Sequence, residues 1–247
     1  MKGWKENFIF FPDSYFIGDP AAWGLPFEDI YFPTADELTL HGWFVPGSSR
    51  ITLVWCHGNA GNISYRLDNL KLLHDRLALN IFIFDYRGYG QSQGEPSEEG
   101  TYRDAEAAAA YLRIRKDIDQ DAVVIFGRSL GGAIAVDLAS NYQFLGLILE
   151  STFSSLAGMF PYLPPDAIPI KYDSLAKMKQ VRMPLLMLHG DCDEVVPFQS
   201  GRDLFEAANE PKEFYTIKGA GHNDTYTTGG QGYMAALQGF ISGLKGT

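Results

Sequence analysis

The most informative segment of the chain is VVIFGRSLGG, residues 123–132. Residues 123–126 form a short run of β-branched and aromatic residues, which suits a strand buried on both faces. Glycines follow, and they permit a sharp turn, because a Cβ at position 127 or 131 would collide with the neighbouring chain. A helix is predicted after the turn, over residues 130–140. A G-x-S-x-G pentapeptide between a strand and a helix typically exposes a nucleophilic serine. The segment therefore predicts a nucleophile at Ser129, at a helix N-terminus whose dipole favours negative charge.

The same strand-like pattern recurs on either side of this segment. Further short apolar runs occupy residues 51–56, 81–84, 147–149 and 185–188. Amphipathic or alanine-rich stretches that predict helices occupy residues 65–79, 101–115, 199–208 and 232–244. This alternation predicts an α/β fold with a twisted, doubly wound parallel sheet and helices on both faces. Residues 27–33 and 38–45 alternate apolar and polar side chains, which predicts an antiparallel hairpin at the sheet edge. We expect a single domain over residues 1–247.

The segment 151–183 departs from this alternation. It carries prolines at 161, 164, 165 and 169, which oppose a long helix. A long irregular segment in a compact domain is usually functional, so we predict a short cap over the strand ends. Its large apolar residues would line a pocket for a short or medium acyl group, or would only bury the cap against the body; they are Phe153, Met159, Phe160 and Leu163.

Composition excludes several function classes. The net charge is −10 and Lys and Arg form no cluster, which argues against nucleic acid as a partner. No apolar stretch reaches the ~18 residues of a membrane span, and we expect a cytoplasmic protein. Cys56 and Cys192 lie far apart without metal-ligand spacing, so they predict two free thiols in a reducing compartment. We expect neither a metal nor a cofactor.

A serine nucleophile needs a base that removes its proton. His222 lies in the small-residue loop GAGHND, residues 219–224, after a predicted strand at 213–217. In folds that carry this serine turn, the base follows both the nucleophile and the acid in sequence. His57 and His189 are alternatives, each followed by glycine at a strand end, but their positions in the chain favour a role in bracing loops.

The acid that orients the base is expected after the strand at 185–188, where the sequence reads HGDCDEVVP (189–197). Asp193 is the favoured residue, since it must fix the imidazole tautomer and stabilise the imidazolium. Asp191 is expected to hold the loop backbone in an Asx-type turn. Glu150, at the end of the strand at 147–149, is a further candidate.

The oxyanion of an acyl-transfer intermediate needs two donors already in place. One is expected to be the backbone N–H of Leu130, directly after the nucleophile. The second is expected from the loop HGNAGN, residues 57–62, with Asn59 the first choice and Ala60 the alternative. A plain strand-to-helix connection remains the other interpretation of this loop.

Five motifs together resemble the α/β-hydrolase superfamily over nearly the whole chain: WCHGNAGN (55–62), FDYRGYGQSQG (84–94), FGRSLGG (126–132), LHGDCDEVVP (188–197) and GAGHND (219–224). The resemblance implies a mostly parallel sheet of about eight strands and a triad of Ser129, Asp193 and His222. HGNAGN with GRSLGG looks most like a subgroup that includes membrane-tethered protein depalmitoylases and bacterial carboxylesterases.

The residues and the resemblance together predict a serine hydrolase that cleaves carboxylic esters or thioesters, with a small acyl ester or thioester as its partner. Serine at position 129 disfavours the relatives that use aspartate or cysteine as nucleophile, such as dehalogenases and dienelactone hydrolases. The main prediction is a carboxylesterase for short- to medium-chain acyl esters, and the alternative is an acyl-protein thioesterase. Acyltransferase activity and a non-catalytic binding or scaffold protein on a hydrolase fold stay open.

Overall fold

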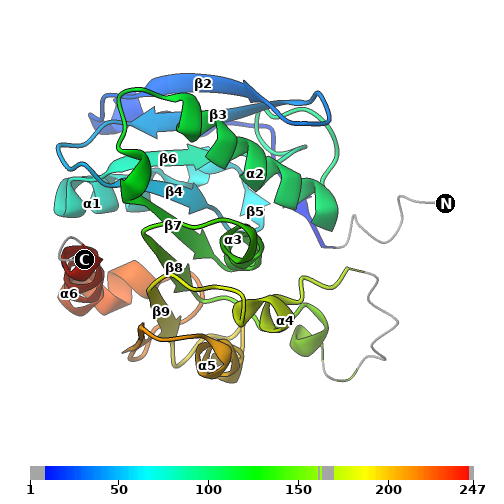
Figure 1. The fold of residues 1–247 in the computed structure, drawn as a ribbon, viewed down its shortest axis with the longest axis vertical. Helices are drawn as coiled ribbons and strands as arrows, with labels where there is room; N and C mark the ends of the chain where they lie inside the picture. Colours follow the sequence, from blue (N-terminus) through cyan, green and yellow to red (C-terminus); the bar gives the residue numbers. More distant parts are fainter. Residues whose placement is uncertain (1–8, 161, 163–169, 245–247) are drawn as a thin grey trace. The chain divides into compact units, whose positions relative to one another are not determined.

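The computed structural model of the protein describes residues 9–160, 162 and 170–244, which fall into two compact units, one ending at Val123 and one beginning at Val124. Each unit carries four main strands with helices packed on them (Figure 1). Eight strands, mostly parallel, alternate along the chain with helices, which confirms the predicted fold class.

In the first unit the strand order is β2 (Glu28–Pro33), β3 (Thr39–Val45), β6 (Asn80–Phe84), β4 (Thr52–Cys56). Strands β2 and β3 pair antiparallel, as predicted for the hairpin, whereas β4 and β6 pair parallel. Buried and exposed residues alternate at the end of β2, where Ile30 and Phe32 face the core and Tyr31 faces outward. Every residue of β4 is buried, as its continuous apolar sequence predicts.

The main helices of the first unit are α1 (Leu67–Leu77), preceded by the 3₁₀ turn η3 (Ile63–Arg66), and α2 (Glu98–Ile114), which crosses the strands in Figure 1. Helix α2 begins three residues before the predicted start, because the Ser97 hydroxyl caps it by accepting the N–H of Gly100 at 3.0 Å. Several short elements had no sequence signal because two to four residues show no periodicity: β1 (Phe11–Pro12), β5 (Ala60–Gly61), η2 (Pro20–Trp23) and η4 (Gln120–Ala122).

The second unit contains four strands in sequential order: β7 (Val123–Arg128), β8 (Gly146–Glu150), β9 (Leu185–Gly190) and β10 (Lys212–Ile217). All three pairings are parallel. The carboxyl ends of parallel strands lie along one edge of a sheet, which is where open α/β folds place their sites. The loops after β7, β8, β9 and β10 therefore meet at that edge.

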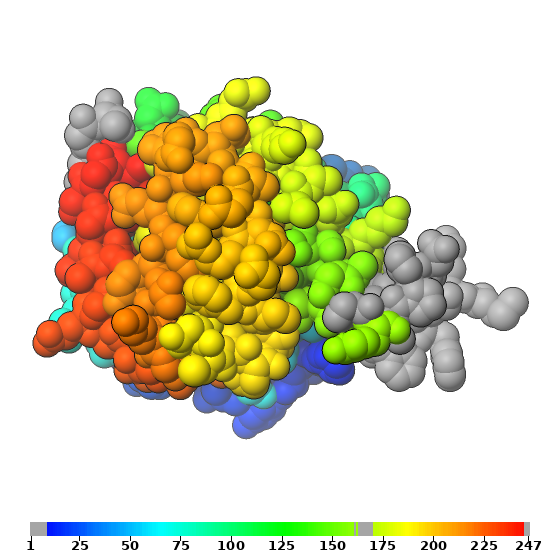
Figure 2. Space-filling view, turned by 90° about the horizontal axis from the view of Figure 1, so that it is seen from below, coloured from blue at the N-terminus to red at the C-terminus, as the bar shows by residue number. Residues whose placement is uncertain are grey.

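Four helices cover this sheet: α3 (Leu130–Asn141), α4 (Ser174–Met178), α5 (Phe198–Ala207) and α6 (Thr225–Leu244). Helices α3 and α6 lie on opposite sides of β8 and β9 in Figure 1, and the face seen in Figure 2 is formed mostly by the yellow and orange segments, which include α5. Helix α6 starts seven residues before the predicted start, and Gly230, with a φ of 48°, interrupts it.

The predicted cap region, 151–183, contains only the 3₁₀ turn η5 (Ala157–Met159) and helix α4 as regular elements among its described residues. Of the predicted pocket residues, Leu163 lies outside the described residues. Among the helices of the described chain, none combines the length and the apolar character needed to cross a membrane.

Candidate active site

Ser129 occupies a sharp turn between β7 and α3. Its φ is 53° and its ψ is −121°, a strained conformation for a residue with a side chain. Gly127 makes the turn possible, since a Cβ there would lie 2.5 Å from the carbonyl oxygen of Gly131 and 2.6 Å from the Cβ of Ala135. The turn has the form predicted from the pentapeptide.

Strand β8 and the residues after it hold the Ser129 backbone in this conformation. The N–H of Ser129 donates to the carbonyl oxygen of Glu150 at 2.9 Å, and the hydroxyl of Thr152 donates to the carbonyl oxygen of Ser129 at 2.8 Å. Gly132 lets Thr152 approach, because a Cβ on Gly132 would lie 2.4 Å from the Thr152 Cβ. The backbone N–H and the backbone carbonyl of the strained serine are thus both held by hydrogen bonds.

The loop after β10 brings His222 to the serine. The Nε2 atom of His222 lies 3.1 Å from the Oγ of Ser129, and His222 is 6% exposed. Its Nδ1 atom lies 2.9 Å and 3.1 Å from the two carboxylate oxygens of Asp193. Because carboxylate oxygens only accept, Nδ1 carries the proton and Nε2 is left as the acceptor for the serine hydroxyl.

Asp193 serves both the imidazole and its own loop. Its Oδ1 accepts the N–H groups of Val195 at 2.9 Å and Val196 at 2.8 Å, so that Asp193 forms the Asx-type turn predicted for Asp191. Asp191 instead accepts the N–H of Gly219, in the loop that carries the histidine, at 2.6 Å. That prediction was wrong because the short Asp191 side chain points across to the neighbouring loop.

Electrostatics keep Asp193 ionised. Burial raises the pKa of the Asp193 carboxyl, but hydrogen bonds from His189 and His222 outweigh burial and hold that pKa well below its usual range. The buried His189 places Nε2 3.1 Å from the carbonyl oxygen of Val196 and 3.5 Å from the Oδ2 of Asp193. A charged carboxylate can stabilise the imidazolium that forms when His222 accepts a proton.

Glu194 also supports the histidine loop, because its Oε2 accepts the N–H of His222 at 3.2 Å. Glu150, the alternative acid, accepts hydrogen bonds from Arg128, Thr225 and Tyr233 instead.

The three predicted oxyanion residues fall in different units. Leu130 is the first residue of α3, so its N–H belongs to the first-turn amides that no helix carbonyl accepts. Asn59 and Ala60 lie in the first unit, in the loop after β4. The Asn59 side chain is engaged there, since its Oδ1 accepts the hydroxyl of Tyr89 at 2.7 Å and the N–H of Phe11 at 3.3 Å. If Asn59 donates to the oxyanion as predicted, the donor is therefore its backbone N–H.

The rival histidine of the first unit, His57, is fully buried, and its Nδ1 lies 2.7 Å from the carbonyl oxygen of Gly58. This contact within its own loop fits the bracing role that the sequence favoured for it.

The predicted pocket residues of the cap differ in exposure. Phe153 is 4% exposed and its ring packs edge-on against Tyr172, with 6.4 Å between ring centroids. Met159 is partly exposed and Phe160 is 48% exposed. Phe153 is thus buried, while Met159 and Phe160 present apolar surface to solvent.

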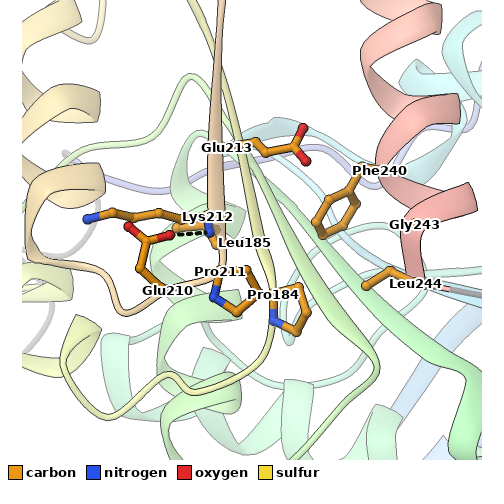
Figure 3. Close-up of a pocket in the computed structure, with 9 residues that line it drawn as sticks. All are labelled: Pro184, Leu185, Glu210, Pro211, Lys212, Glu213, Phe240, Gly243 and Leu244. Carbon is orange, nitrogen blue, oxygen red and sulfur yellow. Dashed lines mark hydrogen bonds between the residues drawn. The ribbon is translucent and has the colours of Figure 1, made fainter. Parts of the chain in front are cut away.

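A separate hollow of about 270 Å³ lies at the other end of the strands (Figure 3). It is lined by Pro184, Leu185, Glu210, Pro211, Lys212, Glu213, Phe240, Gly243 and Leu244. Strands β9 and β10 begin at this hollow, whereas Asp193 and His222 lie in the loops where those strands end. The hollow is therefore distinct from the serine site.

Sequence reasoning missed the residues that support the site rather than form it: Arg128, Thr152, Glu194, Thr225 and Tyr233. The only available signal was position, because Arg128 precedes the serine and Glu194 follows the acid. Hydrogen bonds between residues distant in sequence leave no periodic pattern.

Known proteins resemble this chain along most of its length. A family model described as alpha/beta hydrolase fold matches residues 51–168. An uncharacterized protein of Mycobacterium tuberculosis is 35% identical over 246 residues, covering 96% of this chain and 87% of the relative. The alpha/beta hydrolase domain-containing protein WAV2 of Arabidopsis thaliana is 34% identical, covering 94% of this chain and 86% of the relative.

Among solved structures, the Pyrococcus furiosus esterase Pf2001 superposes with a TM-score of 0.80 at 19% identity, covering 94% of this chain and 98% of the esterase. At that identity the likeness shows the fold alone. The sequence relatives cover nearly the whole chain at a level that establishes common descent, and one of them is named for its fold. The chain belongs to the α/β-hydrolase family.

Proposed function

We propose that this protein is a serine carboxylesterase that hydrolyses small acyl esters through an acyl-enzyme. The observation that carries the proposal is the chain of contacts from Ser129 Oγ to His222 Nε2, at 3.1 Å, and from His222 Nδ1 to Asp193 Oδ2, at 2.9 Å. A buried carboxylate, a tautomer-fixed imidazole and a hydroxyl within hydrogen-bond reach make up the arrangement that activates a serine.

In the proposed reaction, Ser129 Oγ attacks the acyl carbonyl carbon as His222 Nε2 takes the hydroxyl proton. The carbonyl π electrons move to oxygen, and the N–H of Leu130 stabilises the resulting oxyanion. The imidazolium then protonates the leaving alcohol as the bond to it breaks. A water molecule repeats the sequence on the acyl-enzyme and releases the acid.

The second oxyanion donor stays a prediction, from the backbone of Asn59 or Ala60. Removing one such donor costs about 3–4 kcal/mol of transition-state stabilisation in a serine hydrolase. The Asn59 side chain accepts hydrogen bonds from Phe11 and Tyr89, which lie outside its loop. A substitution of Asn59 therefore tests these contacts rather than a side-chain oxyanion donor.

The proposed acyl pocket uses the apolar surface of Met159 and Phe160, together with the buried Phe153. Leu163 stays a prediction for the same pocket. The same three catalytic groups would also cleave a thioester, because a thiol leaves more readily than an alcohol. An acyl-protein thioesterase is therefore the second candidate, and substrate comparison separates the two.

Labelling with a fluorophosphonate tests the proposal. We expect the wild type to be labelled and Ser129→Ala to be unlabelled, with kcat on p-nitrophenyl esters reduced about 10⁶-fold, as for removal of a triad serine. Ser140→Ala is the matched control, since Ser140 lies near the other end of the same helix and its hydroxyl donates to the carbonyl oxygen of Asp137.

A wild type that is neither labelled nor active would favour the binding or scaffold alternative. Rates across p-nitrophenyl esters and acyl thioesters of increasing chain length then identify the acyl group. Faster turnover of long-chain thioesters than of short esters would overturn the proposal of a carboxylesterase and favour the acyl-protein thioesterase. Product analysis with added alcohol distinguishes hydrolysis from acyl transfer.

A further inference from the structure

A buried ion pair lies directly behind the proposed catalytic residues. Arg128, the residue before the nucleophile, is 8% exposed, and Glu150, the last residue of β8, is fully buried. The Nε of Arg128 donates to Oε1 of Glu150 at 3.1 Å. Replacing a buried ion pair by uncharged residues is often neutral or stabilising, because burial removes both charges from water. Stability alone therefore does not account for this pair.

Arg128 connects two segments: the turn at residues 127–131, which we call the nucleophile turn, and the loop at residues 219–224, which we call the base loop. Its Nη2 donates to the backbone carbonyl oxygen of His222 and, at 3.3 Å, to the Oδ1 of Asn223. Arg128 is also bonded covalently to Ser129. One side chain thus links the backbone that carries the base to the backbone that carries the nucleophile.

The glutamate holds the helix that follows the base loop. Its Oε1 accepts the hydroxyl of Thr225 at 2.6 Å, and its Oε2 accepts the hydroxyl of Tyr233 at 2.7 Å. Burial and the nearby charge of Glu150 raise the pKa of the Tyr233 phenol well above its usual value, so the phenol stays a donor. Thr225 and Tyr233 both belong to α6, which begins three residues after His222.

Gly219 and Gly221 restrict the backbone of the base loop little, so the position of the loop depends on its hydrogen bonds. Asp191 and Glu194 accept two of them, from Gly219 and His222, and the contacts of Arg128 add to these. Proton transfer is sensitive to position, and a displacement of about 1 Å can cost ~100-fold in rate. Arg128 contacts the loop at residues 222 and 223, and Glu150 anchors α6 just beyond it. Both residues thus contact the chain at or shortly after His222.

We infer that Arg128 and Glu150 are positioning residues that act as one unit to hold His222 within proton-transfer distance of Ser129. The inference rests on the proposed function and deepens it. Both residues act through His222, so they affect the chemical step rather than substrate binding. Only arginine meets the geometry, because a lysine carries a single Nζ and cannot contact Glu150 through one nitrogen and the loop through another.

The decisive variant is Arg128→Met combined with Glu150→Gln. It removes both charges together, while the glutamine amide still offers a partner to Thr225 and to Tyr233. We expect this variant to unfold near the wild-type urea concentration, with kcat on a p-nitrophenyl ester lowered ~10–100-fold and KM unchanged. The rate of fluorophosphonate labelling should fall by the same factor.

Arg128→Lys provides the second test, and it decides the matter if the double variant does not fold. It keeps the positive charge beside Glu150 but cannot contact Glu150 and the base loop through two different nitrogens, so we expect a similar loss of kcat. Arg202→Met is the matched control, because Arg202 pairs with Glu206 at 3.0 Å on the exposed surface of α5; its kcat should equal that of the wild type.

A folded double variant or lysine variant with wild-type kcat overturns the inference, as does a change in KM alone. Failure of the proposed function gives a different result, because the wild type itself would then be neither labelled nor active.

Discussion

Replacing Asp193 by asparagine tests whether the carboxylate fixes the tautomer of the proposed base. The backbone dictates how an asparagine would sit. Because the N–H groups of Val195 and Val196 both donate to Oδ1, the amide oxygen must take that position. The amide nitrogen is then left where Oδ2 lies, 2.9 Å from Nδ1 of His222.

This orientation reverses the imidazole. An amide N–H can only donate, so at this 2.9 Å contact Nδ1 of His222 becomes the acceptor and Nε2 carries the proton. The tautomer with the proton on Nδ1 is disfavoured, because it faces the amide N–H and keeps only the longer contact, 3.1 Å, to the amide oxygen. Nε2, 3.1 Å from the Ser129 hydroxyl, can then no longer accept its proton. In a serine-protease triad the same substitution lowers kcat about 10⁴-fold, which corresponds to about 5 kcal/mol of transition-state stabilisation. We expect a loss of that size here.

The assay is kcat/KM on a p-nitrophenyl ester, together with the rate of fluorophosphonate labelling. Asp191→Asn is the matched control, because its amide oxygen can still accept the N–H of Gly219 that Asp191 accepts at 2.6 Å. The control should stay near wild-type activity. The reasoning is refuted if Asp193→Asn retains kcat/KM within about tenfold of the wild type while Ser129→Ala is inactive.

The same variant tests the electrostatics of the site through stability. The pKa of Asp193 is lower in the folded protein than its ordinary value of 3.8. The unfolded chain therefore binds the proton more readily, so the charged carboxylate contributes stability above about pH 4 that is lost as pH falls further. In urea unfolding experiments, stability should fall less steeply below that pH for Asp193→Asn than for the wild type. Parallel curves would contradict the assigned pKa direction.

Two further predictions concern the nucleophile turn and the thiols. Thr152→Val removes the hydroxyl that donates to the carbonyl oxygen of Ser129 at 2.8 Å. We expect the free energy of unfolding in urea to fall by about 1 kcal/mol and kcat to be reduced. An unchanged unfolding midpoint would count against this role of Thr152. Cys56 is fully buried, and burial raises its pKa to about 12, whereas Cys192 is exposed. A thiol reagent should therefore modify only Cys192 before unfolding and both cysteines afterwards; equal reaction rates in the native protein would disprove the buried placement.

Local sequence patterns were enough to predict most of the fold. Continuous apolar runs became the buried strands β4, β7, β8 and β9, and the alternating stretches became the β2–β3 hairpin. These predictions succeed because strand burial and turn geometry depend on neighbouring residues. Element ends were less predictable, since the start of α2 depends on the Ser97 cap.

Sequence patterns also nominated Ser129, Asp193 and His222, because turn glycines and the order of residues along the chain restrict the choice. The contacts of the other acidic residues came only from the tertiary structure: Asp191 and Glu194 hold the loop that carries the imidazole, and Glu150 binds Arg128.

The same holds for the segment 151–183, where Phe153 is buried and Phe160 is half exposed although both are phenylalanines in one irregular segment. The physical reason is the range of the interactions involved. Hydrophobic periodicity and turn preferences act over a few residues and are visible in the sequence. The direction of a side chain and the identity of its partner are decided only when the strands pair and the helices pack. Arg128 and Glu150 are 22 residues apart in sequence, and Ser129 and His222 are 93 residues apart.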